Sequence, residues 1–170
     1  EDKLSVIAEA AASYRTESRD AALVGINMEG PFISEAKKGA QNAAYLHAPD
    51  ADMFRRLQEK ANGLFKLCDL APELPGAMET IEALAGEVRL SIAHTEADYD
   101  TACEAFRRGA RQVTHLYNAM PPFSHRAPGV IGAAFDSENV AVELIADGVH
   151  IHPSVVRAVF TLFGGRVILI

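Results

Sequence analysis

The stretch VRLSIAHTEADYDTACEAFRR, residues 88–108, decides the fold. Its first six residues form a short apolar run that predicts a buried strand, and this strand ends at His94 and Thr95. Residues 96–108 predict a helix, which is broken at Gly109. A strand followed by a helix is one βα unit, and repeated units of this kind require right-handed crossovers and a parallel sheet.

The same unit recurs along the chain. Apolar runs predict six strands, at residues 22–28, 64–70, 88–93, 112–116, 140–146 and 166–170. Helical patterns are found at residues 3–14, 50–62, 76–85, 96–108 and 153–163. No glycine-rich phosphate turn follows any of the strands, which argues against a dinucleotide-binding sheet. We therefore predict one domain over residues 1–170, an α/β fold with about six of the eight βα units of a TIM-type (β/α)8 barrel.

Composition and charge narrow the class of protein. The chain is 49% hydrophobic and 23% charged, which is typical of a globular domain. A net charge of −7 without a basic stripe argues against nucleic-acid binding. No apolar run approaches the roughly 20 residues of a membrane span, and no signal peptide is apparent, so we expect a cytoplasmic protein. Cys68 and Cys103 are expected to be buried free thiols, which fits a reducing compartment.

Polar residues stand where several predicted strands end, which is where the chemistry of a βα barrel is located. These residues are Glu29, Glu73, His94, His115 and His150, with Asp147 close by. One carboxylate and two imidazoles suit a catalytic divalent ion such as Zn²⁺ or Fe²⁺. We therefore predict Glu29, His94 and His115 as metal ligands. A bound ion of this kind lowers the pKa of its water and polarises a carbonyl group.

The other polar residues have less specific interpretations. His150 is expected to face the substrate, and Arg126 is either an anion partner, because its guanidinium can bind two phosphate oxygens, or a solvated surface arginine. Glu73 and Asp147 are more simply explained as residues that cap a helix or hold a loop. Three prolines exclude a continuous helix from residues 114–132, so we expect a loop there that carries function.

Six blocks of sequence give the chain a family resemblance. They are NMEGPFIS (27–34), KKGAQN (37–42), LAPE (70–73), AHTEADY (93–99), THLYNAMPPFSHRAPG (114–129) and IADGVH (145–150). Together they resemble the N-acetylglucosamine-6-phosphate deacetylases of the amidohydrolase superfamily. The resemblance implies a metal-dependent barrel hydrolase, with one or two divalent ions, that converts N-acetylglucosamine 6-phosphate to glucosamine 6-phosphate and acetate. By this resemblance, the metal ligands of the family correspond to Glu29, His94 and His115.

The resemblance also implies which residues bind the substrate. Asn118 and Ala119 match a pair whose backbone meets the sugar phosphate, and His150 matches a histidine that contacts the substrate. Arg126 matches a phosphate-binding arginine that reaches the site of the partner subunit, so a homodimer is implied. Gln41 stands where some family members have a substrate-contacting histidine.

The family pattern extends beyond both ends of the 170 residues. Its first barrel strands would precede Glu1, and its general acid–base, an aspartate in a TDA-type motif, is expected just beyond Ile170. Two alternatives stay open. One is another deacetylase or cyclic amidase of the superfamily, against which Arg126 and the Asn118–Ala119 turn argue. The other is an inactive truncated chain that serves as a binding or assembly module.

Overall fold

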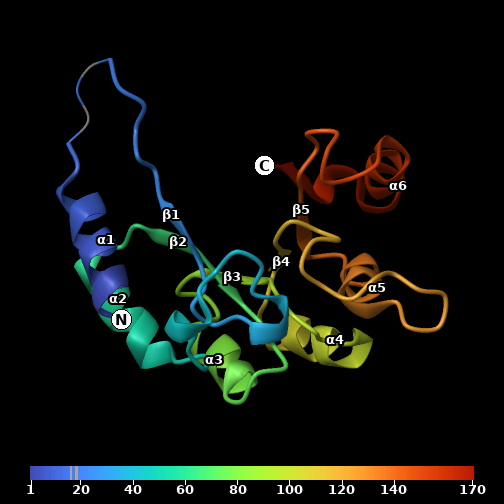
Figure 1. Ribbon diagram of the computed structural model, residues 1–170, viewed down its shortest axis with the longest axis horizontal. Helices are drawn as coiled ribbons and strands as arrows, with labels where there is room; N and C mark the ends of the chain where they lie inside the picture. Colours follow the sequence, from blue (N-terminus) through green and yellow to red (C-terminus); the bar gives the residue numbers. More distant parts are fainter. Residues whose placement is uncertain (16, 18) are drawn as a thin grey trace.

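The protein forms a curled parallel sheet with helices along its outer side (Figure 1). The computed structural model describes residues 1–15, 17 and 19–170. The strands are β1 (Ile26–Glu29), β2 (Phe65–Leu70), β3 (Arg89–Ile92), β4 (Gln112–Val113), β5 (Ala141–Leu144) and β6 (Val167–Leu169). The helices are α1 (Asp2–Ser13), α2 (Ala51–Lys60), α3 (Ala77–Leu84), α4 (Tyr99–Arg108), α5 (Gly129–Asp136) and α6 (Pro153–Phe163). Short 3₁₀ turns occur at Glu35–Lys37, Ala43–Tyr45 and Gly164–Arg166.

The order of the strands in the sheet is their order in the sequence, β1 to β6, and every adjacent pair is parallel. This arrangement confirms the prediction of six strands in a partial βα barrel. Among the described residues, no helix has the length and apolar character needed to cross a membrane.

The two faces of the sheet differ in chemistry because successive side chains of a strand point to opposite sides. One face is apolar and packs against the helices; its buried side chains are Met28, Cys68, Leu70, Leu90, Ile92, Val113, Val142 and Leu144. The other face is polar, and its register places Glu29 beside Asp69, Asp69 beside Ser91, and Ser91 beside Gln112. The concave side of the sheet is therefore lined with hydrogen-bonding groups.

Capping residues set the starts of three helices. The Asp50 carboxylate accepts hydrogen bonds from two N–H groups in the first turn of α2, both at 2.9 Å, and the Asp98 carboxylate accepts one of 2.8 Å from Thr101 in α4. Pro153 opens α6, and the His152 ring accepts a hydrogen bond of 3.2 Å from the Ser154 N–H. Gly63 lies beyond the end of α2, whose C-cap is Ala61.

Several predicted boundaries were wrong. The strand expected at 22–28 begins at Ile26, because residues before it have no neighbouring strand; Val24 is 82% exposed. The strand expected at 112–116 ends at Val113, since the backbone turns sharply at His115. The helix expected from residue 96 begins only at Tyr99, after the cap at Asp98. Strands β5 and β6 are also shorter than the predicted ranges.

Helix α5 was not predicted, because residues 114–132 were expected to be a loop. Its sequence, GVIGAAFD, is almost entirely apolar, so it has no polar face that would reveal a helical period. Residues 129–134 are buried, and the helix packs against α4. The prolines do exclude helix from the preceding part of the segment, as expected.

The two cysteines are free thiols. Cys68 is buried, as predicted, and burial raises the pKa of its thiol. Cys103 is only half-buried, because it lies on the flank of α4 rather than on the face that packs against the sheet.

Candidate functional site

Three side chains from separate strand ends converge at the carboxyl edge of the sheet. Glu29 is the last residue of β1, His94 follows β3 and His115 follows β4. The Glu29 Oε1 atom lies 2.7 Å from His94 Nε2 and 3.8 Å from His115 Nε2. The two Nε2 atoms are 3.1 Å apart. The structure therefore brings together the three residues that were predicted as metal ligands, with their ligand atoms within 4.8 Å of one another.

A backbone carbonyl orients one of the two imidazoles, that of His94. His94 Nδ1 donates a hydrogen bond of 2.7 Å to the carbonyl oxygen of Lys37, which leaves Nε2 directed at the cluster. The His115 ring meets the His94 ring edge-on, with an interplanar angle of 84°. His115 Nδ1 is buried and has no hydrogen-bond partner among the described residues. A ligating histidine is commonly oriented by a carbonyl at its other nitrogen, as His94 is here.

The Glu29 carboxylate is ionised beside the two imidazoles. The imidazoles of His115 and His94 hold the pKa of the Glu29 carboxyl well below its usual range. The hydrogen bond to Glu29 in turn raises the pKa of His94. An ionised carboxylate and two facing imidazole nitrogens are the donors that a catalytic zinc ion uses. By the chemistry of this donor set, the residues present fit a divalent ion.

Two of the expected substrate-binding segments lie directly against the cluster. The Gln41 side chain donates a hydrogen bond of 2.9 Å from Nε2 to the backbone oxygen of Glu29. The Asn118 N–H donates to the backbone oxygen of His115 at 2.9 Å, and the oxygen of Ala119 accepts from Thr95 at 3.0 Å. Gln41 is thus engaged with the backbone of a candidate ligand, and the Asn118–Ala119 turn follows the histidine immediately.

The other two expected substrate-binding residues stand apart from the cluster. In the described part of the chain, neither Arg126 nor His150 forms a hydrogen bond or ion pair with the three candidate ligands. Arg126 is exposed and lines a cavity of about 520 Å³ between its own loop and the start of α4. His150 Nδ1 lies 2.7 Å from Asp147, and half of its side chain is exposed.

Glu73 and Asp147 hold loops, as their simpler interpretation predicted. The Glu73 carboxylate accepts hydrogen bonds from the Thr95 hydroxyl and the Glu96 N–H, and so fixes the loop after β3. The Asp147 carboxylate accepts two backbone hydrogen bonds of 2.9 Å in the loop after β5. Those N–H groups lower the pKa of Asp147 to about 2.

Sequence reasoning missed Asp69, which lies in β2 beside Glu29. Its carboxyl group is fully buried and accepts hydrogen bonds from Thr114 Oγ1 at 3.0 Å and Asn27 Nδ2 at 3.3 Å. Burial raises its pKa to about 7. The available signal was a carboxylate inside an otherwise apolar strand, FKLCDL.

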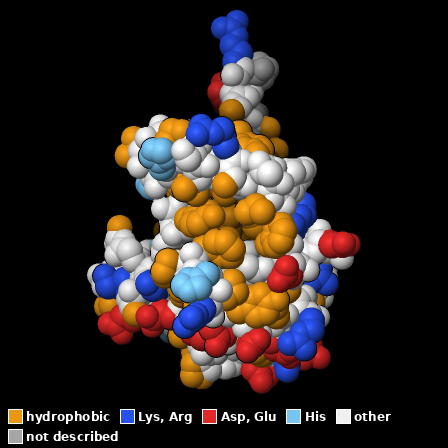
Figure 2. Space-filling model, turned by 90° about the vertical axis from the view of Figure 1, so that its right-hand side faces the viewer, with side chains coloured by type: hydrophobic (Ala, Val, Ile, Leu, Met, Phe, Trp, Pro, Cys, Tyr) orange, Lys and Arg blue, Asp and Glu red, His pale blue; other side chains and the backbone are white. Residues whose placement is uncertain are grey.

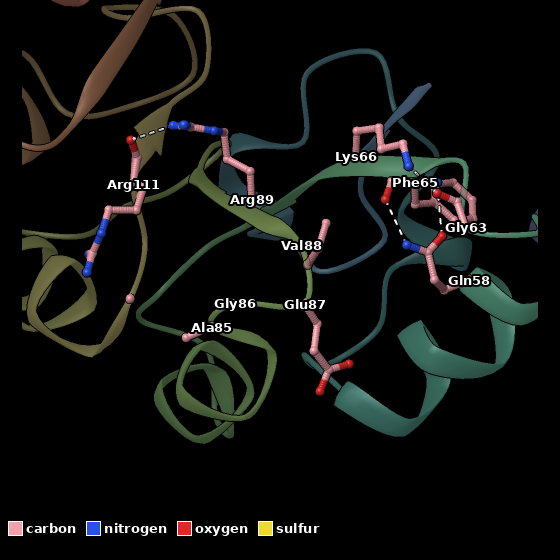
Figure 3. Close-up of a pocket in the computed structure, with 11 residues that line it drawn as sticks. Gln58, Gly63, Phe65, Lys66, Ala85, Gly86, Glu87, Val88, Arg89 and Arg111 are labelled. Atoms are coloured by element: carbon pink, nitrogen blue, oxygen red, sulfur yellow. Dashed lines mark hydrogen bonds between the residues drawn. The ribbon is translucent and has the colours of Figure 1, made fainter. Parts of the chain in front are cut away.

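A cavity of about 560 Å³ lies at the opposite edge of the sheet (Figure 3). Its walls are the turns that lead into β2, β3 and β4, and Arg89 donates a hydrogen bond across it to the Arg111 carbonyl. Because barrel sites form at the carboxyl ends of strands, this amino-terminal cavity is not the candidate active site.

The fold and the cluster define a βα-barrel protein with one carboxylate and two imidazoles at the carboxyl ends of its strands. The chain is homologous to the N-acetylglucosamine-6-phosphate deacetylases. It is 42% identical to that enzyme of Bacillus subtilis over 151 residues, which are 88% of this chain and 38% of the relative. No family model matches the chain.

Solved structures show the same relationship. The N-acetyl-D-glucosamine-6-phosphate deacetylase of Mycobacterium smegmatis matches 99% of this chain and 47% of its own, with a TM-score of 0.86 and 33% identity. A mutant of that enzyme in complex with N-acetyl-D-glucosamine-6-phosphate matches with a TM-score of 0.87 and 33% identity, over 99% of this chain and 43% of its own. The chain thus spans less than half the length of these relatives.

Proposed function

We propose that the protein containing this chain hydrolyses the acetamide of N-acetylglucosamine 6-phosphate, which yields glucosamine 6-phosphate and acetate. The observation that carries the proposal is the convergence of Glu29, His94 and His115 at the strand ends of a chain homologous to such deacetylases. The solved complex of a relative with this sugar phosphate supports the choice of substrate.

In the proposed site, Glu29, His94 and His115 would hold one or two divalent ions, zinc or iron. A bound ion would polarise the acetamide carbonyl and lower the pKa of a water molecule. Glu29 supplies an ionised carboxylate, and the Lys37 carbonyl accepts a hydrogen bond from His94 Nδ1, so Nε2 would be the ligating nitrogen once it releases its proton to an incoming ion. The proton-transferring aspartate expected beyond Ile170 stays a prediction.

The phosphate is proposed to bind at the loop after β4. The Asn118–Ala119 turn begins three residues after His115, so ligand and phosphate groups would share one rigid segment. The Arg126 guanidinium has no ion-pair or hydrogen-bond partner among the described residues, which leaves its donors free for an anion. Its exposed position supports a homodimer in which it serves the site of a second copy. His150 is proposed to contact the sugar.

The metal assignment is tested by Glu29→Gln in the full-length protein, with Glu35→Gln as the control because Glu35 is exposed and outside the cluster. Glu29→Gln should lose bound metal by elemental analysis and lose deacetylation of N-acetylglucosamine 6-phosphate, whereas Glu35→Gln should keep both. Full metal occupancy in Glu29→Gln would overturn the ligand assignment. Metal binding without any deacetylation by the unsubstituted protein would point to another amide substrate.

The phosphate assignment is tested by Arg126→Ala, with Arg107→Ala as a matched exposed arginine on α4. Arg126→Ala should raise KM for the phosphorylated sugar far more than KM for N-acetylglucosamine. Arg107→Ala should change neither. Equal effects of Arg126→Ala on the two substrates would remove the phosphate role.

A further inference from the structure

Strand β2 provides no candidate ligand, yet it lies between the strands that do. Its residue Asp69 is in register with Glu29 of β1 on one side and with Ser91 of β3 on the other. Asp69 is fully buried and Ser91 is fully buried, so this contact region is shielded from solvent. A carboxylate in such a place is costly unless its oxygens accept hydrogen bonds.

Both oxygens of Asp69 accept a hydrogen bond from a residue one or two positions before a candidate ligand. Oδ2 accepts from Asn27, which lies two residues before Glu29 on the same face of β1, and Oδ1 accepts from Thr114, which directly precedes His115. The single hydroxyl proton of Thr114 is used in that bond. The Ser91 hydroxyl, 2.7 Å away, therefore donates to Thr114 Oγ1.

The network joins β1, β2, β3 and β4 just below the cluster. Through it, one buried carboxylate links β1 to the residue after β4, next to the point where Glu29 Oε1 and His115 Nε2 lie 3.8 Å apart. The hydrogen bond from Ser91 extends the network to β3, and His94 follows Ser91 by three residues. No other carboxylate among the described residues has bonds to the neighbours of two candidate ligands.

We propose that Asp69 is a positioning residue of the metal centre, which fixes the strands that carry Glu29 and His115 through its hydrogen bonds to Asn27 and Thr114. The inference rests on the proposed function, since it assigns a supporting role at the same site. Residues that orient metal ligands typically contribute 10- to 100-fold to metal affinity.

The test measures zinc affinity of the full-length protein by competition with a chromophoric chelator, and cobalt(II) absorption as a readout of ligand geometry. Asp69→Ala should weaken zinc binding by about 10- to 100-fold and alter the cobalt spectrum. Asp69→Asn should restore most of the affinity, because its amide can accept from Thr114 and donate to Asn27 after that side chain rotates. Unchanged zinc affinity in Asp69→Ala, with only a lower Tm of the metal-free protein, would overturn the positioning role.

Thr114→Val provides a second variant that keeps the side-chain volume and removes one hydrogen bond to Asp69. Its matched control is Thr80→Val, because Thr80 is also a buried threonine and lies in α3, outside the network. Thr114→Val should weaken zinc binding and Thr80→Val should not; equal affinities would contradict the proposal even if Asp69→Ala does not fold. Glu29→Gln separates the two hypotheses. If it retains zinc, the metal centre itself fails, whereas loss of zinc in Glu29→Gln with full affinity in Asp69→Ala removes only the positioning role.

Discussion

Unusual backbone conformations are concentrated at the candidate site. His94, His115, Tyr117 and Ala119 have φ values of 45°, 34°, 76° and 50°, in a region that costs free energy for residues with a side chain. All four lie in the loops that follow β3 and β4. Because the chain turns sharply there, the two Nε2 atoms reach a separation of 3.1 Å. These residues therefore adopt backbone conformations that their own φ preferences disfavour, and the conformations bring the ligand atoms together.

Gly30, directly after Glu29, should not tolerate a side chain. Its φ is +89°, and an added Cβ would lie 2.6 Å from Gln41 Oε1. Gly30→Ala should force the Gln41 side chain away and break its hydrogen bond to Glu29, which is worth about 1 kcal/mol. Gly86→Ala is the control, since Gly86 has a φ of +93° and nothing within 4 Å of an added Cβ.

Urea denaturation of both variants measures the difference. Gly30→Ala should lower the free energy of unfolding by about 1 kcal/mol more than Gly86→Ala does. In a Gln41→Ala background this excess should disappear, because the hydrogen bond is already absent. Equal losses in the two original variants would show that Gly30 is required only for its backbone conformation.

At the scale of elements, the sequence predicts best where capping residues mark the ends. Helix α6 agrees with the predicted range 153–163 because Pro153 fixes its start and Gly164 follows its last turn. Helix α4 begins three residues later than predicted, because Glu73 holds the Thr95–Glu96 backbone in a loop. Those contacts join residues 22 and 23 positions apart and leave no local pattern. Helix α5 escaped prediction since its residues are almost all apolar and give no amphipathic period.

The candidate site was likewise predictable where the signal is local, and not where contacts join residues far apart in the sequence. Glu29, His94 and His115 could be predicted because polar residues at the ends of apolar strands stand out in a sequence. The contacts that orient them come from the long loop after β1, where Lys37 meets His94 and Gln41 meets Glu29. These pairs depend on how the loop folds back over the sheet, so sequence spacing could not reveal them.

Asp98 caps α4 at the point where the helix borders the Arg126 cavity, so its carboxylate should stabilise the fold. Asp98→Ala should lower the free energy of unfolding by about 0.5–2 kcal/mol, the usual cost of losing an N-cap. Asp100→Ala is the control, since Asp100 lies in the first turn of the same helix without capping it. Thermal unfolding of the two variants measures the effect, and an equal loss in both would show that the charge of the first turn matters more than the cap.

For the whole molecule, the distribution of polar and apolar surface is uneven. Apolar side chains gather on the side of the molecule that carries α5 and α6 (Figure 2). Phe135 of α5 and Phe160 of α6 are each 44% exposed. The concave face of the sheet holds two buried carboxyl groups, Asp69 and Glu143, and burial raises the pKa of each. Stability of the fold therefore depends on the protonation of groups close to the candidate site.

This dependence gives a pH prediction for Asp69. Its pKa is about 7 in the folded protein and 3.8 in an unfolded chain, so between these values the folded state holds the extra proton. The free energy of unfolding should then fall as pH rises through this window, by at most about 1.4 kcal/mol per pH unit from this group. Asp69→Asn cannot release a proton, so its stability should fall less steeply than that of the unsubstituted protein.

Urea denaturation of the metal-free protein at pH 4.5, 5.5, 6.5 and 7.5 tests the prediction. Glu143 shifts stability in the same direction, so the quantity to compare is the difference between the unsubstituted protein and Asp69→Asn, which isolates Asp69. That difference should move steadily in favour of Asp69→Asn as pH rises. Asp100→Asn, at an exposed position, should follow the unsubstituted protein throughout. If the Asp69→Asn curve runs parallel to the others, the Asp69 carboxyl has an ordinary pKa, and its buried hydrogen bonds compensate fully for the loss of solvent.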